Sequence, residues 1–221
     1  GMGGFTAPVY FQAGPSPSAM IIEDLDGDGD RDAALTNSSA SRITIVFTEN
    51  GDFASTRVVA IGQQPTSIAS GDFNGDGRVD LVAANFSSDT MTVVYNDENA
   101  EFTSKLTLSA GNGPHGLVCD DFNGDGAIDI ACTQYFTGAV YLYRGVGDGS
   151  FLAPLVTSVA NRPTAIAAGD FDLDGDPDLA VANSNSGTIT FLRNDGGVMS
   201  FWMQESAGLQ PSDIRVEDLD R

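Results

Sequence analysis

The stretch DFNGDGRVD, residues 72–80, decides the fold because the chain repeats it at an even interval. Related segments occupy residues 24–32 (DLDGDGDRD), 121–129 (DFNGDGAID) and 170–178 (DFDLDGDPD), and a fifth begins at Asp218. Their first aspartates are 48 or 49 residues apart, and a proline precedes each segment. Chance does not produce five copies at so even a period, so we interpret the chain as a repeat protein.

Each repeat has the pattern of four short strands. In the second repeat the expected strands are 67–72, 81–85, 91–95 and 102–108, which are rich in apolar and β-branched residues and bounded by Gly, Asn, Asp and Ser. No window shows a sustained helical period. Four strands per repeat of this length predict an all-β fold, a β-propeller of four-stranded blades. A parallel β-helix is the weaker alternative, because its turns are shorter than this period.

The repeats predict one propeller domain over residues 1–221. Each end of the chain matches a single strand of a blade, so we expect either a fragment of a larger ring or an unusually small ring. Unpaired blade edges invite pairing with another chain, and we therefore expect a homo-oligomer formed through the open edges. The expected units are approximately 15–62, 63–111, 112–160 and 161–209, with partial strands at 1–14 and 210–221.

The charge balance limits the partners. The chain carries 31 acidic and 10 basic residues, a formal net charge of −21. Nucleic acid is excluded as a partner because phosphate binding needs clustered Lys and Arg, and an anionic membrane surface is disfavoured for the same reason. No apolar run approaches the ~18 residues of a membrane-spanning helix, so no membrane insertion is expected.

The four acidic segments are predicted to be calcium loops. Positions 1, 3, 5 and 9 carry Asp or Asn in all four copies, and alternate residues of a tight, glycine-containing loop can point inward together. Calcium prefers six to eight oxygen ligands, whereas zinc and copper would need sulfur or imidazole, and magnesium keeps its waters. Position 7 varies in type and would contribute only its backbone carbonyl. We expect about four Ca²⁺ ions, one per complete repeat.

The predicted ligands fall at the same five positions of each loop. They are Asp24, Asp26, Asp28, Asp30 and Asp32; Asp72, Asn74, Asp76, Arg78 and Asp80; Asp121, Asn123, Asp125, Ala127 and Asp129; and Asp170, Asp172, Asp174, Asp176 and Asp178.

The role expected for these ions is structural. Without metal, each loop would hold three or four carboxylates within a few ångströms, where like charges repel strongly. Calcium modules of this kind are often occupied only at about 10⁻⁴–10⁻³ M calcium, which favours an extracellular or cell-surface location.

The loop pattern Asp-x-(Asp/Asn)-x-Asp-Gly-x-x-Asp, with Phe-x-x-Pro upstream at residues 5–8 and 151–154, resembles the FG-GAP and VCBS-type repeats. These repeats occur in integrin α-subunit propellers, in secreted bacterial proteins and in some fungal-type propeller lectins. The resemblance covers almost the whole chain. It implies a propeller, usually seven-bladed, with calcium loops on one face and ligands on the opposite face or between blades.

Together these observations predict a calcium-stabilised, non-catalytic binding or adhesion module that acts outside the cell on a protein or glycan ligand. The first alternative is a carbohydrate-binding propeller, that is, a lectin. The second is an accessory domain of a larger secreted enzyme.

Four further residues are candidates for ligand binding. Phe86, Tyr135 and Phe136 fall between the second and third strands, on the face opposite the acidic loops, where they could stack on a sugar or anchor a protein. Blade packing is the simpler explanation of these rings. The single histidine, His115, could be a catalytic base, but an exposed loop residue is the favoured interpretation, and no Gly-x-Ser-x-Gly elbow supports catalysis.

The two cysteines, Cys119 and Cys132, flank the third acidic loop. A cross-strand disulfide would need suitable Cα and Cβ geometry. Two buried thiols are the favoured interpretation.

Overall fold

The computed structural model describes residues 10–217. These residues form sixteen strands and one short 3₁₀ helix, and the strands build four separate four-stranded antiparallel sheets. In each sheet the strands are paired in the order in which they occur along the chain. The predicted all-β propeller with four-stranded blades is confirmed.

The blades follow one another along the chain. Blade 1 contains β1 (Pro17–Glu23), β2 (Asp32–Asn37), β3 (Arg42–Glu49) and β4 (Asp52–Ala60). Blade 2 contains β5 (Pro65–Gly71), β6 (Asp80–Asn85), η1 (Phe86–Ser88), β7 (Thr90–Tyr95) and β8 (Ser104–Ser109). Blade 3 contains β9 (Pro114–Asp120), β10 (Asp129–Gln134), β11 (Ala139–Tyr143) and β12 (Leu155–Ser158), and blade 4 contains β13 (Pro163–Gly169), β14 (Asp178–Asn183), β15 (Thr188–Arg193) and β16 (Ser200–Ser206).

The strands of the second repeat lie close to their expected positions, with β5 beginning two residues earlier and β8 two residues later than expected. Phe102 is the reason for the late start of β8. Its backbone adopts a left-handed φ of 52°, and its ring turns into the core, where only 2% of its surface stays exposed. A residue in that conformation cannot continue an extended strand.

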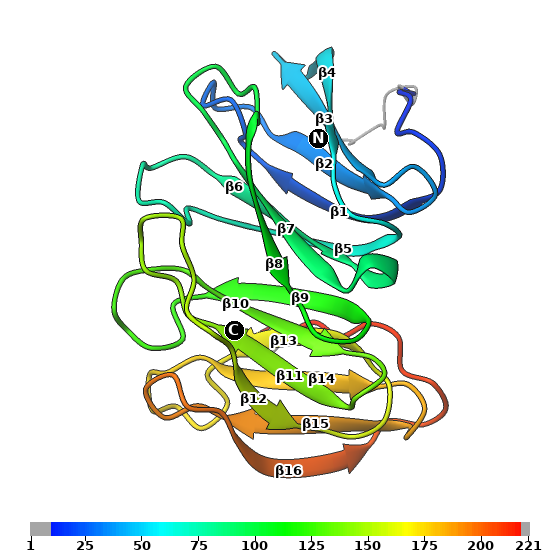
Figure 1. The fold of residues 1–221 in the computed structure, drawn as a ribbon, viewed down its shortest axis with the longest axis vertical. Helices are drawn as coiled ribbons and strands as arrows, with labels where there is room; N and C mark the ends of the chain where they lie inside the picture. The colour runs from blue at the N-terminus through cyan, green and yellow to red at the C-terminus, as the bar shows by residue number, and fades with distance from the viewer. Residues whose placement is uncertain (1–9, 218–221) are drawn as a thin grey trace, which may run out of the picture.

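The first strand of each blade packs against the first strand of the next, β1 on β5, β5 on β9 and β9 on β13. In Figure 1 the blades succeed one another from blade 1 at the top to blade 4 at the bottom. The four inner strands and residues 212–215 line a cavity of about 500 Å³.

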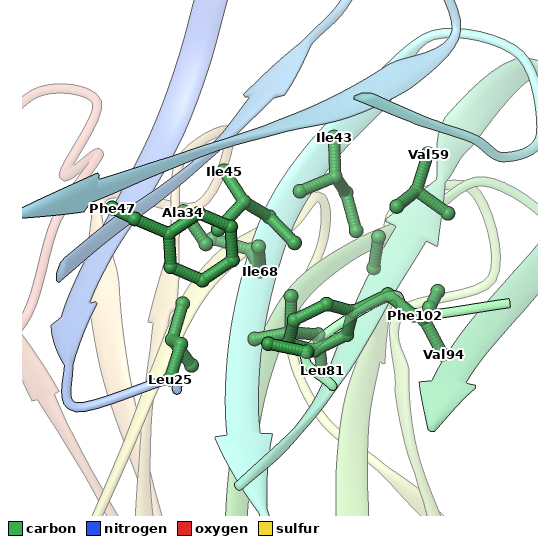
Figure 2. Packing of buried hydrophobic residues seen from close by; sticks show 12 residues of the cluster. Leu25, Ala34, Ile43, Ile45, Phe47, Val59, Ile68, Leu81, Val94 and Phe102 are labelled. Atoms are coloured by element: carbon green, nitrogen blue, oxygen red, sulfur yellow. The ribbon is translucent and has the colours of Figure 1, made fainter. Parts of the chain in front are cut away.

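Apolar clusters fill the spaces between successive blades. Figure 2 shows the cluster between blades 1 and 2, where Ile43 and Ile45 of β3 meet Ile68 of β5 and Leu81 of β6. Successive side chains of a strand point to opposite faces, so β6 sends Leu81 toward blade 1 and Val82 toward blade 3. All six residues of β6 are therefore buried.

The outward faces of the end blades are less covered. Met20 of β1 is 54% exposed, whereas its counterparts Ile68, Leu117 and Ile166 are 6–8% exposed because each packs on the preceding blade. Self-association through the open blade edges stays a prediction.

The expected single strands at the chain ends have different outcomes. Residues 1–9 lie outside the described part of the chain, and residues 10–14 are not in a strand. The predicted strand over 212–218 is wrong for residues 212–217, which have no β pairing. The first strand of each blade is paired with a second strand, and no strand within residues 10–217 takes that place beside residues 212–217. The segment still follows the inner-strand path, since Thr164 Oγ1 donates a hydrogen bond to the Pro211 carbonyl (3.2 Å).

Candidate functional site

The four acidic loops all lie at one end of the blades, because each joins the first strand to the second. The connections between second and third strands lie at the other end. In Figure 1 the loop after β9 lies on the left and η1 on the right. The molecule therefore has an acidic-loop end and an opposite end, which we call the η1 end.

Backbone amides wind each acidic loop around its own carboxylates. In the first loop, Asp24 accepts hydrogen bonds from the amides of Gly27 (2.8 Å) and Gly29 (3.0 Å). Asp26 and Asp28 each accept the amide two residues further on, at 3.2 and 2.8 Å. Gly27 and Gly29 have φ values of 80° and 94°, which an L-residue adopts only with strain. The other three loops show the same type of winding.

The winding brings carboxylates together most closely in the first and fourth loops. Candidate ligand oxygens of Asp24, Asp26 and Asp28 lie within 4.8 Å of one another, as do those of Asp170, Asp172 and Asp178. In the second loop the Arg78 guanidinium instead binds Asp76 at 2.8 Å. In the third, the Asn123 amide donates to Asp125 at 2.9 Å.

Two carboxylate oxygens in these loops are buried without a hydrogen-bond partner, Oδ2 of Asp129 and Oδ1 of Asp172. An unpartnered buried carboxylate oxygen is costly unless a cation is close. Positions 1, 3, 5 and 9 of every loop offer a carboxylate or amide oxygen as a ligand atom, which suits a hard divalent cation. The residues present therefore fit calcium.

The ninth residue of each loop also holds the blade together. Asp178 is fully buried and accepts the amide of Phe171 at 3.0 Å and that of Asn194 at 2.8 Å. Asp32 and Asp80 accept two backbone amides in the same way. This carboxylate thus ties the start of its loop to the end of the third strand. The sequence pattern had identified only its ligand role.

Where the seventh loop residue is acidic, its carboxylate accepts a backbone amide of a neighbouring turn. Asp30 accepts the amide of Asn50, and Asp176 accepts the amide of Gly196 (3.0 Å), both in turns between the third and fourth strands. These carboxylates stabilise the neighbouring turn, which leaves the carbonyl of position 7 for an ion.

Burial, with a smaller contribution from nearby carboxylates of the same loops, raises the pKa of Asp80 and of Asp129 to about 6, against the opposing effect of backbone hydrogen bonds. Burial also raises the pKa of Asp26 and Asp32. The charged loops are therefore held in an unfavourable state when no cation is bound.

We expect the metal-free protein to become more stable as the pH falls from 7 toward 5. The folded-state pKa of Asp80 and Asp129 is about 6, above the ordinary value of 3.8, so the folded protein binds more protons between these values. The free energy of unfolding must then decrease as the pH rises through 6. Urea unfolding in chelator at several pH values measures this slope. The double variant Asp80→Asn/Asp129→Asn should flatten it, and an unchanged slope would contradict the assignment.

At the η1 end, the structure brings together the four residues that the sequence had singled out. The Phe86 ring lies 5.6 Å from that of Tyr135, 5.4 Å from Phe136 and 6.0 Å from His115. His115 and Tyr135 are stacked at 5.8 Å. Phe136 is 60% exposed, and the other three are half-buried. We call Phe86, His115, Tyr135 and Phe136 the aromatic patch.

The expectation that His115 is an exposed loop residue is wrong. It lies in β9, half-buried, and its Nδ1 donates a hydrogen bond to the Thr164 carbonyl of the next blade (2.8 Å). In blades 1 and 2 the same position holds Ser18 and Thr66, whose hydroxyls donate to carbonyls of the following blade. His115 therefore links two blades, and burial lowers the pKa of its imidazole.

Sequence reasoning missed Arg162, whose guanidinium carbon lies 5.4 Å from the centroid of the Tyr135 ring. Arg162 precedes β13, and nothing in its local sequence places it beside a residue of the previous blade. Trp202, on the outer strand β16, lies outside this group.

Both cysteines are free thiols. Cys119 pairs with Ile130 and Cys132 with Leu117 in the β9–β10 ladder, so the two are not directly opposite each other. Cys132 is buried in an apolar cluster and the partly buried Cys119 packs against it, and this burial raises the pKa of each thiol.

No helix in residues 10–217 is long and apolar enough to cross a membrane.

The four-stranded blades, packed through their inner strands, define a β-propeller, and each blade carries one acidic loop. The sequence profile of the FG-GAP-like repeat matches residues 24–83, 72–132 and 121–181. The chain belongs to this family. No curated protein matches the chain by sequence.

Similar solved structures are propeller proteins. A complex of BBS1N with ARL6DN has a TM-score of 0.63 at 16% identity, covering 90% of this chain and 60% of that one. A proposed 6-phosphogluconolactonase from Bacteroides uniformis has a TM-score of 0.62 at 15% identity, covering 86% of this chain and 57% of that one. The biofilm matrix protein Bap1 of V. cholerae has a TM-score of 0.52 at 22% identity, covering 86% of this chain and 28% of that one. This chain thus spans 60% or less of each relative's length, and the likeness shows the fold alone.

Proposed function

We propose that this chain is a calcium-stabilised, non-catalytic binding module of an extracellular or cell-surface protein. The observation that carries the proposal is the fourfold repetition of one loop. In every copy the first carboxylate accepts backbone amides of its own loop and the ninth is buried, and in the first and fourth loops candidate ligand oxygens lie within 4.8 Å of one another.

A structural role for the ions follows from where the loops lie. Each loop connects the two innermost strands of a blade, and its ninth residue is tied to the third strand. An ion held there would neutralise carboxylates whose charge the fold otherwise tolerates poorly, such as Asp80 and Asp129. Millimolar calcium would keep such sites filled, which supports a location outside the cell.

Two observations favour binding over catalysis. The only histidine, His115, uses its Nδ1 to link two blades. The conspicuous carboxylates are the proposed calcium ligands or accept backbone amides of their own blade. The aromatic patch, in contrast, offers an exposed ring at the end away from the loops, as a binding surface does.

The proposal is tested by counting the ions. Calorimetric titration of the metal-free protein with calcium should give about four sites, and the double variant Asp24→Asn/Asp26→Asn should remove one of them. Titration with magnesium at the same concentrations is the matched control and should give little heat. The absence of calcium binding up to about 10 mM would contradict the proposal, because sites weaker than that stay empty even in extracellular media.

A further inference from the structure

We propose that the aromatic patch, together with Arg162 and the cavity beside it, binds an acidic saccharide, with a sugar ring on the patch and a carboxylate on Arg162. This inference names a ligand class and rests on the proposed binding role, but it does not depend on calcium occupancy.

The first support is the shape of the surface. The aromatic patch draws on two blades, with Phe86 from blade 2 and Tyr135 and Phe136 from blade 3. Phe136 presents most of its ring to solvent, and Phe86 and Tyr135 support it at 5.4 and 5.1 Å. Rigid exposed rings give a flat apolar platform at low entropic cost, and the C–H face of a pyranose suits such a platform.

The second support is the state of Arg162. Its guanidinium lies over the Tyr135 ring, and no carboxylate within residues 10–217 lies within 4.0 Å of it. A planar guanidinium held in this way is preorganised for two parallel hydrogen bonds to a carboxylate.

The third support is the cavity beside the patch, which has a volume of about 240 Å³. Such a volume is below the usual range for drug-sized ligands, about 300–1,000 Å³, and so suits a single sugar unit. Hydroxyl and amide side chains can both donate to and accept from sugar hydroxyls. The lining consists of Tyr135, Arg162, Ser184, Asn185, Gln210 and Ser212.

The fourth support is the distribution of charge. The acidic loops hold 16 of the 31 acids, all at the far end of the blades. At the η1 end the strand connections contain one acid, Asp89, whose carboxylate accepts the Gly113 amide (2.8 Å), and one base, Arg162. Charges further apart than about 10 Å are largely screened, so an anionic ligand can approach this end of a strongly acidic protein. The strand connections at the η1 end are residues 38–41, 61–64, 86–89, 110–113, 135–138, 159–162 and 184–187, and residues 207–210 follow β16 at the same end.

The test uses oligosaccharides ending in glucuronic acid, galacturonic acid or N-acetylneuraminic acid, each paired with its carboxyl-reduced form. Calorimetry of the full chain in calcium buffer should show at least one acid binding about tenfold more tightly than its reduced form, as expected for one charge-assisted bidentate contact. An acidic peptide serves as the probe for a protein ligand.

Two variants assign the contacts. Arg162→Gln should abolish the preference for the acid, and it suits the backbone, because Gln64 and Gln210 occupy the equivalent positions with φ values of 51° and 53° against 54° for Arg162. Phe136→Ala should weaken binding of the acidic and reduced forms alike. The matched controls are Arg31→Gln, at the acidic-loop end, and Phe201→Ala, a ring 61% exposed on β16, and both should bind like the wild type.

The inference is overturned if none of the three acids binds, if the reduced forms bind equally well, or if the acidic peptide binds as tightly as the best sugar in an Arg162-dependent way. Thermal unfolding of the same proteins keeps the two proposals apart. Acid binding without a calcium-induced rise in Tm would remove the metal part of the proposed function and leave this inference standing. A calcium-induced rise in Tm without saccharide binding would leave the metal part of the proposed function standing and overturn this inference.

Discussion

Replacing Asp178 by alanine should lower the free energy of unfolding by roughly 3–5 kcal/mol, even in chelator. The carboxylate is fully buried and is the acceptor for two backbone amides, those of Phe171 and Asn194. An amide that loses its buried partner costs about 1–3 kcal/mol, and alanine also leaves a small void. For a chain of this length the loss corresponds to a fall in Tm of roughly 10 °C.

The control for this prediction lies in the same loop. Asp174 is exposed, and its carboxylate accepts only the amide of Asp176. In chelator, Asp174→Ala should cost less than about 1 kcal/mol, because water can replace the lost hydrogen bond. The loss in the free energy of unfolding for Asp178→Asn should lie between the losses for these two alanine variants, since asparagine keeps one acceptor oxygen. Equal losses for the two alanine variants would mean that the ninth residue is only a potential ligand and does not hold the blade together.

The blades could be predicted from the sequence because the sequence repeats with the period of one blade. Five acidic segments 48 or 49 residues apart require equivalent structural units, and apolar runs between them mark the strands. The loop side chains could be predicted for the same reason, since alternate positions in a short glycine-containing loop converge locally.

Features that depend on distant partners could not be predicted. The ninth aspartate binds an amide sixteen residues further on, and because any residue has an amide, no residue type signals that contact. Arg162 reaches Tyr135 only because the blade arrangement brings two connections together. The expected strand over 212–218 matched its counterparts in pattern, but a strand needs a hydrogen-bonded partner, and pattern alone does not supply one.

Removing calcium should produce the largest effect of all, a loss of roughly 6 kcal/mol in the free energy of unfolding. An ion that binds only the folded state contributes RT ln(1 + [L]/Kd), about 1.4 kcal/mol per site when free calcium is ten times Kd, and four independent sites add up to that total. A typical domain is stable by only about 5–15 kcal/mol, so chelation would remove much of its stability. The change in formal charge, from −13 with four ions to −21 without, works in the same direction through self-repulsion.

Thermal unfolding with millimolar calcium and with excess chelator measures this loss, and Tm should fall by roughly 10–20 °C. The fourth loop provides the internal check. Asp174→Ala should reduce the calcium-dependent rise by about a quarter while leaving the Tm in chelator nearly unchanged, because it removes a candidate ligand that has little structural role of its own. Magnesium at the same concentration should not restore Tm, since it retains its waters in sites of this kind. If calcium and chelator give superimposable curves, the loops are solvated acidic turns, and the stability of the propeller must come from its apolar clusters and blade links alone.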